Sequence, residues 1–263
     1  MTRIRHLAIV AAALVVSTGP LEAQRTGDRA RLIFTVSGAY VQGKGLWTVR
    51  DQPVLDGPST IDHLGITRSI MPTLGAGLSG TYFAGEHVGL TADAFLLGLG
   101  YEDNCVTLTG VQSAQTAEVC DDIDDNERRA AAVTLSGGAV FRFFSREAIS
   151  PFARVSAGLL FSNQSSVLTQ GFSDEGVQLT IYEDEKDTRV GPALAIGVGA
   201  SMPLGRAYQL RWEVRDNIVG IERVTGATSD ARFEPPHERT FKHLFSVLIG
   251  IDIVLERQRG RRY

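Results

Sequence analysis

This sequence has very few lysines and, beyond its first residues, no long apolar stretch. Lys44, Lys186 and Lys242 are its only lysines, and 26 basic against 30 acidic residues leave a net charge of −4. A nucleic-acid-binding protein carries a basic face, so this composition argues against nucleic acid as a partner. Beyond the first residues no apolar run reaches the length of about 18 residues that a transmembrane helix needs, so none is expected.

The first residues have the pattern of an export signal. Arg3, Arg5 and His6 precede the uncharged apolar run Leu7–Val16, and small residues follow before Gln24. This pattern predicts a cleaved secretory signal peptide over residues 1–23. We expect a short periplasmic lead over residues 24–30 and a basic periplasmic tail over residues 257–263.

Cysteine is nearly absent as well, with Cys105 and Cys120 as the two examples. In an exported chain, two cysteines this close in sequence predict a disulfide. Closing a loop of about 15 residues contributes roughly 3 kcal/mol in the chain-entropy model. A metal site is disfavoured, because no histidine or third cysteine lies near them in the sequence, and no cofactor is indicated.

Large and very small side chains alternate through residues 190–202, VGPALAIGVGASM. Leu194, Ile196 and Val198 share one parity, while glycine, alanine and serine occupy the other. Successive side chains of a strand point to opposite faces. A soluble sheet would carry long charged groups on its second face, whereas very small groups suit a crowded interior. The alternation therefore favours an apolar face turned outward to lipid over a soluble, lipocalin-like barrel.

Eight segments show this period of two. They cover residues 31–42, 68–83, 87–101, 129–144, 151–163, 188–204, 207–221 and 240–256. Short turns alternate with long polar connections, at residues 43–67, 102–128, 164–187 and 222–239. That alternation around an even number of strands is typical of outer-membrane barrels. We predict an all-β fold over residues 31–256: an eight-stranded antiparallel up-and-down transmembrane β-barrel with short periplasmic turns and four long extracellular loops.

Aromatic side chains on the outward parity support this placement. They fall near both ends of the strands, at Phe34, Tyr82, Phe143 and Tyr208 on the short-turn side and Tyr40, Phe161 and Phe245 on the other. Two aromatic girdles are expected where lipid meets water. Asp216 also has outward parity, so it must lie near the long-loop rim or follow a bulge.

Charged residues of both signs gather on the inward parity of the strands. They are Asp93, Arg142, Arg154, Arg211, Glu213, Arg215 and Asp252. Buried charges are costly unless they are paired, which predicts a connected polar network across the lumen. The network either lines a conduction path or seals the barrel, and sealing is favoured because eight strands leave little free bore.

The predicted loops contain two weaker candidates for chemistry. The acidic run at residues 121–127 offers carboxylate oxygens of the kind that bind Ca²⁺, but it lacks the EF-hand spacing, so a solvated loop is favoured. Ser59, Asp62 and His63, with His237 in the last loop, contain the residue types of a nucleophile and its base. No nucleophile-elbow motif accompanies them, so a non-enzymatic protein is favoured.

Strand number, loop alternation and the chemistry of the two faces resemble the small eight-stranded outer-membrane barrels, the class of the OmpA transmembrane domain and of OmpX-like and OmpW-like proteins. The resemblance covers residues 31–256 and implies a monomer in contact with outer-membrane lipid and lipopolysaccharide. The last strand looks like the signal that such proteins present to the barrel-insertion machinery. We expect a non-enzymatic protein with surface loops for interaction or an envelope-support role. The alternatives are a narrow channel or carrier for small solutes or hydrophobic molecules, and a lipid A-modifying enzyme.

Overall fold

The computed structural model describes most of the region in which strands are predicted. The described residues are 31–56, 60–108, 114–125, 130–143, 149–184, 189–205, 207–228 and 234–256. The expected signal peptide, periplasmic lead and basic tail lie outside these ranges. Among the described residues, no helix combines the length and apolar character needed to cross a membrane.

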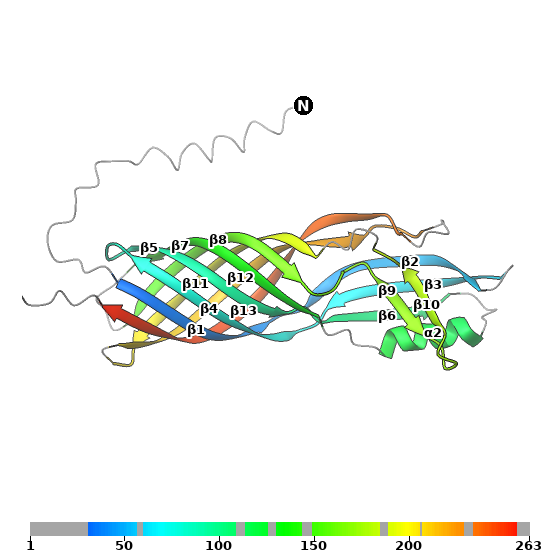
Figure 1. Cartoon of the computed structure of the whole chain (residues 1–263), viewed down its shortest axis with the longest axis horizontal. Helices are drawn as coiled ribbons and strands as arrows, with labels where there is room; N and C mark the ends of the chain where they lie inside the picture. The colour runs from blue at the N-terminus through cyan, green and yellow to red at the C-terminus, as the bar shows by residue number, and fades with distance from the viewer. Residues whose placement is uncertain are drawn as a thin grey trace, which may run out of the picture.

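Eight antiparallel strands close into a barrel (Figure 1). They are β1 (Arg31–Val41), β4 (Thr73–Phe83), β5 (Val88–Gly98), β7 (Ala131–Arg142), β8 (Ser150–Ser162), β11 (Val190–Pro203), β12 (Tyr208–Val224) and β13 (His237–Glu256). Each strand pairs with the barrel strands before and after it in the chain, and β1 closes the barrel against β13. All eight lie within or largely overlap the predicted segments, so the predicted fold class is confirmed.

Large apolar side chains cover the outside of this barrel. Leu74 is 80 % exposed and Ile249 is 64 % exposed, and outward-facing valine, leucine, isoleucine and aromatic residues surround the strands. Soluble monomers rarely expose contiguous apolar surfaces of more than a few hundred Å². A closed barrel also pairs its backbone groups between strands, as a hydrocarbon environment demands. We call this outer surface the apolar belt.

The long connections are largely folded, contrary to the prediction of polar loops. β2 (Lys44–Asp56), β3 (Thr60–Ile70) and β6 (Tyr101–Thr107) form a three-stranded sheet in the order β2-β3-β6. β2 follows β1, β3 leads into β4, and β6 follows β5, so this sheet continues the barrel wall past the rim (Figure 1). The prediction failed because much of the outward face of β3, at His63, Gly65, Thr67 and Ser69, is polar or glycine and has the composition of a loop.

Three shorter elements complete this end of the molecule. The helix α2 (Ala114–Asp125) and the hairpin of β9 (Thr169–Phe172) and β10 (Gln178–Tyr182) lie beside the sheet (Figure 1). We call β2, β3, β6, α2, β9 and β10 together the cap. Part of the predicted acidic loop is therefore helical: Asp124 accepts a hydrogen bond from Asn104, and Asp122 accepts one from the backbone N–H of Phe172.

One apolar core joins the cap to the barrel. Its buried side chains include Leu97, Leu160 and Leu244 from the upper part of the lumen and Leu64 and Ile66 from the cap sheet. Nearer the short turns, the lumen is filled by small and polar groups together with a small apolar cluster of Ile33, Phe83, Val140 and Phe152. Nearer the cap, it is filled by the apolar side chains of the shared core. The cap and the barrel form one packed unit.

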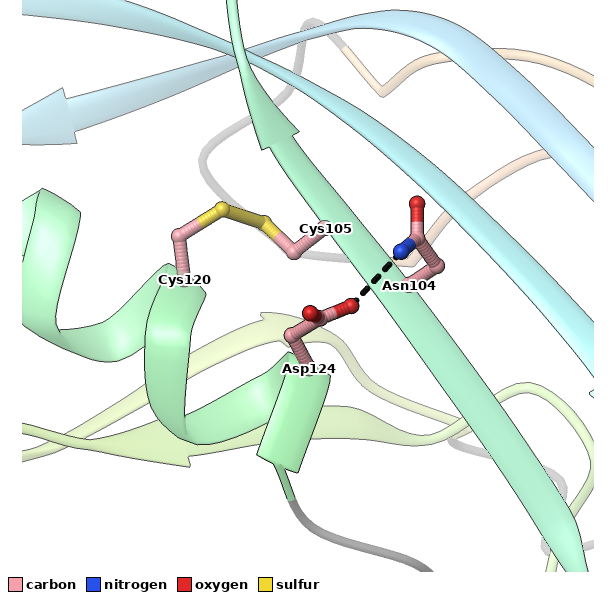
Figure 2. The surroundings of a disulfide bond; sticks show 4 residues. All are labelled: Asn104, Cys105, Cys120 and Asp124. Carbon is pink, nitrogen blue, oxygen red and sulfur yellow. Dashed lines mark hydrogen bonds between the residues drawn. A yellow bond between two sulfur atoms is a disulfide. The ribbon is translucent and has the colours of Figure 1, made fainter.

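A disulfide fastens α2 to the cap sheet (Figure 2). It joins Cys105 of β6 to Cys120 of α2, as predicted, across a sequence separation of 15 residues. Val119 and Ile123 of the same helix are buried in the shared core. The disulfide therefore holds a helix that also contributes to the apolar packing.

Removing this disulfide should loosen the cap and leave the barrel intact. In the double variant Cys105→Ser/Cys120→Ser, the unfolded loop regains its conformational freedom, which should cost the cap about 3 kcal/mol of local stability. Hydrogen exchange of the α2 amides should accelerate accordingly, while exchange in β11 and β12 should stay unchanged. Equal α2 exchange in both proteins would show that packing alone holds the helix.

Candidate functional site

Glu213 is the centre of an ion-pair cluster inside the barrel. Its Oε1 accepts a hydrogen bond from Arg215 Nε at 2.8 Å, and its Oε2 accepts one from Arg211 Nη2 at 2.9 Å. Arg154 Nη1 lies 3.5 Å from the same Oε2, and Arg154 Nη2 is 2.5 Å from Asp93 Oδ1. All five side chains are buried. Three strands, β5, β8 and β12, are thus connected across the lumen by charge-assisted hydrogen bonds.

The remaining two predicted lumen residues are also buried but have different neighbours. Asp252 accepts a hydrogen bond from Thr35 Oγ1 at 2.6 Å and lies 4.0 Å from Arg211. The guanidinium of Arg142 stacks 4.2 Å from the centre of the Phe83 ring, near the short turns. The structure therefore brings together six of the seven predicted residues, and Arg142 lies against an aromatic ring instead.

The small residues of β11 are what make room for this cluster. A Cβ added at Gly197 would lie 2.5 Å from Glu213 Oε1, and one added at Gly199 would lie 2.7 Å from the Phe152 ring. The cavity left beside the cluster has a volume of about 10 Å³. That is room for about one water molecule. The alternation in residues 190–202 is therefore explained by long charged and aromatic side chains that reach across the lumen from other strands.

The sequence of this chain matches no protein-family model, and no curated protein is significantly similar to it. Solved structures nevertheless resemble it. The outer-membrane protein OprG from Pseudomonas aeruginosa aligns with a TM-score of 0.53 at 10 % identity, over 87 % of this chain and 97 % of that one. The chain folds as a small outer-membrane β-barrel.

Two further structures align at lower scores. The E. coli outer-membrane protein W has a TM-score of 0.41 at 12 % identity, covering 88 % of this chain and 100 % of that one. Neisserial surface protein A has a TM-score of 0.41 at 9 % identity, covering 86 % and 96 %.

The position of Asp216 agrees with this barrel fold. The register between β12 and β13 runs without a bulge from Tyr208 to Val224 and places Asp216 opposite Phe245 of the upper aromatic girdle. Its Oδ2 lies 2.7 Å from Nδ1 of His243. Asp216 therefore lies at the long-connection rim of the belt, the first of the two predicted explanations, where a polar partner is available.

Arg68 is a buried cation in the cap that sequence reasoning missed. Its Nε and Nη2 donate to the two carboxylate oxygens of Asp103, at 2.5 and 2.6 Å. Its remaining donors reach the backbone carbonyl oxygens of Ser166 and Leu168, at 2.8 and 2.9 Å. Arg68 has no exposed surface. The sequence feature that could have revealed it is strand parity, because Arg68 shares the inward face of β3 with buried Leu64, Ile66 and Ile70.

Aromatic rings surround this guanidinium. Its central carbon lies 5.2 Å from the Trp47 ring centre and 5.5 Å from that of Tyr101. Trp47 Nε1 also donates to the carbonyl oxygen of Ser166. Arg68 thereby ties β3 and β6 to residues 166–169, which lie about 100 positions further along the chain. The cap is organised around one charged side chain with satisfied donors.

The buried phenol of Tyr101 should make the cap sensitive to alkaline pH. Burial raises its pKa to about 12, although the nearby Arg68 guanidinium opposes the rise. Because the folded state holds this proton more tightly than the unfolded state, whose phenol titrates near pH 10, the associated stability is complete below about pH 10. It is lost as the pH rises towards about 12. Burial shifts the pKa of Tyr182 in the same direction.

Absorbance of tyrosinate and near-ultraviolet circular dichroism should therefore change together above pH 10. The variant Tyr101→Phe should lose less cap structure on alkaline titration, while Tyr40→Phe, on the exposed belt, should behave as the parent protein. If every tyrosine ionised near pH 10 while the cap stayed folded, the predicted coupling between Tyr101 ionisation and cap structure would be contradicted.

The loop residues weighed as catalytic candidates do not assemble as a set. Asp62 is buried on the inner face of β3, whereas His63 is on the opposite face and pairs with Asp51, its Nδ1 lying 2.6 Å from Oδ1. Nδ1 of His237 contacts the carbonyl oxygen of Pro235. Ser59 lies outside the described residues. Within the described part of the chain, no group of three or more metal-binding side chains is placed to hold an ion.

Apolar side chains are exposed on the outer face of the cap sheet, far from the belt. Leu55 and Ile61 are direct cross-strand partners on β2 and β3, and Leu55 is 63 % exposed. Val106 pairs with Gly65 on the neighbouring strand, and Leu108 would contact a Cβ at Gly65. We call Leu55, Ile61, Val106 and Leu108 the tip patch. Exposed apolar clusters of this kind mark interaction sites.

Proposed function

We propose that this protein is an integral outer-membrane protein whose sealed barrel presents a rigid extracellular binding surface. The observation that carries the proposal is the single apolar core shared by the upper lumen and the cap. A core that spans the rim closes the barrel on the cap side and fixes the cap in one orientation. Binding sites are commonly found on connections held by such a scaffold.

The lumen favours a closed barrel over a channel. Arg154, Arg211, Arg215 and Glu213 occupy the short-turn half and leave a cavity of about 10 Å³. A hydrated ion or a metabolite needs a continuous path through the lumen. The ion-pair cluster blocks the short-turn half of that path, and the apolar core shared with the cap blocks the other half. The binding role is proposed in preference to catalysis because Asp62 and His63 point to opposite faces of β3.

The tip patch is the surface best suited to a partner. It lies on the sheet that continues the barrel wall, on the side of the membrane opposite the short periplasmic turns, and is therefore extracellular in the proposed orientation. Its side chains are held by strand pairing, which lowers the entropy that a partner must overcome on binding. The partner is expected to offer a complementary apolar surface, and the barrel to be a monomer among outer-membrane lipids and lipopolysaccharide.

Two measurements test this proposal. In a planar bilayer the purified protein should give no discrete conductance steps, whereas steps altered by Arg154→Ala would establish a channel. A photo-reactive amino acid at Ile61 on intact cells should form a covalent adduct with a surface partner. The same group at Thr48, on the polar part of the same sheet face, should not. Equal labelling at both positions, or none at Ile61, would contradict binding at the tip patch.

A further inference from the structure

A groove interrupts the apolar belt on the outer wall of the barrel. It crosses β1, β4, β5 and β7 and has a volume of about 740 Å³. Its floor lies where three directly paired outward positions carry almost no side chain, at Gly80, Ala92 and Gly137. Its walls are Phe34, Val36, Leu78 and Leu135.

The chemistry of the groove admits an apolar occupant. Its wall side chains are apolar, and the strand backbones of its floor are paired with each other. The polar residues between the wall positions have inward parity: Asp93 bonds Arg154, and Thr35 bonds Asp252, both inside the lumen. A ligand lying in the groove therefore meets apolar groups and a backbone whose hydrogen bonds are already made.

The glycines of the floor are not required by the packing of the protein itself. A Cβ at Gly137 would meet only the carbonyl oxygen of Thr91, at 3.9 Å, and one at Gly80 only the Phe34 ring, at 3.7 Å. By contrast, a Cβ at Gly138 would lie 2.0 Å from a neighbouring carbonyl oxygen. Larger residues would fit at Gly80 and Gly137, so the space they leave needs another explanation.

The height of the groove identifies the leaflet. Gly80 lies three residues from the short-turn end of β4 at Phe83, and Gly137 lies five residues from that of β7 at Arg142. With about 3.3 Å per residue and a tilt near 45°, these positions lie roughly 7–12 Å above the short-turn rim. That is within one half of a hydrocarbon core of about 30 Å. Short turns face the periplasm, so this half is the phospholipid leaflet.

We propose that this groove binds an acyl chain of a phospholipid from the periplasmic leaflet. The inference rests on the membrane placement in the proposed function and is independent of the tip patch. The groove is continuous with the apolar belt, so a chain reaches it from the surrounding leaflet without crossing a polar surface. An occupied groove would place a resident lipid against β4, β5 and β7 at a fixed site.

The test fills the groove and counts bound lipid. The double variant Gly80→Leu/Gly137→Leu adds two side chains to the floor, while Gly38→Leu adds one to open space on the lipid-facing side of β1, outside the groove. Each protein, folded in detergent, is mixed with dioleoyl phosphatidylethanolamine and analysed by native mass spectrometry. Displacing about two methylenes from the groove should reduce retention of the lipid about tenfold in the double variant. The Gly38→Leu variant should retain lipid as the parent does.

Three outcomes would overturn the inference. They are equal retention in all three proteins, an equal loss in Gly38→Leu, and groove-dependent retention of lipopolysaccharide in place of the phospholipid in a parallel mixture. Folding is checked by the heat-dependent gel mobility of the barrel, and Ala92→Leu replaces the double variant if that variant does not fold. A failure of the membrane placement itself would appear differently, as a parent protein that stays folded and monomeric without detergent.

Discussion

Replacing Glu213 by glutamine should destabilise the whole barrel by about 3–5 kcal/mol, the cost of breaking a buried ion pair by removing one partner. Glutamine keeps the shape of the side chain, so packing is conserved and the change is one of charge. Three guanidinium groups, from Arg154, Arg211 and Arg215, would then remain buried without the carboxylate that contacts each of them. Urea unfolding of the protein in phospholipid vesicles, followed by tryptophan fluorescence, measures the difference.

The matched control is Glu238→Gln on the same sheet. Glu238 pairs with Arg223 where both side chains are about half exposed, and exposed pairs contribute at most about 1 kcal/mol. Its variant should unfold close to the parent. If Glu213→Gln and Glu238→Gln lowered stability equally, the lumen cluster would be well hydrated, which would contradict a sealed lumen.

Replacing Asp103 by asparagine should open the cap while leaving the barrel closed. The guanidinium of Arg68 would lose its bidentate partner in a site with no exposed surface, and the expected loss is again about 3–5 kcal/mol. Here the loss is local, because the pair lies in the cap and not among the barrel strands. Sub-global opening of this kind is a general property of folded proteins.

Two readouts separate local opening from global unfolding in Asp103→Asn. Protease added to intact cells should cut the cap of the variant and spare that of the parent. The heat-dependent gel mobility of the barrel should be the same in both. The exposed position Glu102, changed to glutamine, serves as the control because it removes one carboxylate charge on the solvent side of the same strand. Loss of barrel mobility in Asp103→Asn would show that cap and barrel unfold together.

The local pattern of the sequence was sufficient to identify the barrel strands. The inward placement of Asp93 and Glu213 follows from their parity relative to Leu96 and Trp212, and parity is a local property because a strand alternates its faces at every residue. The same reasoning assigned the outward aromatics, whereas the disulfide followed from two cysteines lying close together in an exported chain. The small residues on the inward parity, such as Gly197, likewise indicate space inside the barrel, and the structure shows that Glu213 fills it.

The same period was present in the cap, but composition concealed it. Leu64, Ile66, Arg68 and Ile70 alternate with His63, Gly65, Thr67 and Ser69, yet the segment contains a charge on its inward face and polar groups on the other. Its local composition therefore predicts a polar loop. It becomes a strand because β2 and β6 continue β1 and β5 on either side of it and supply its backbone partners.

By itself, the sequence determined which residues of each barrel strand face inward and that the outer surface is apolar. Tertiary structure decided which charges meet, that the upper lumen is closed by an apolar core, and that residues 166–169 come to Arg68. The reason is physical: facing depends on a two-residue period within one strand, whereas contact across the lumen depends on the stagger between strands, which barrel closure sets for all eight together.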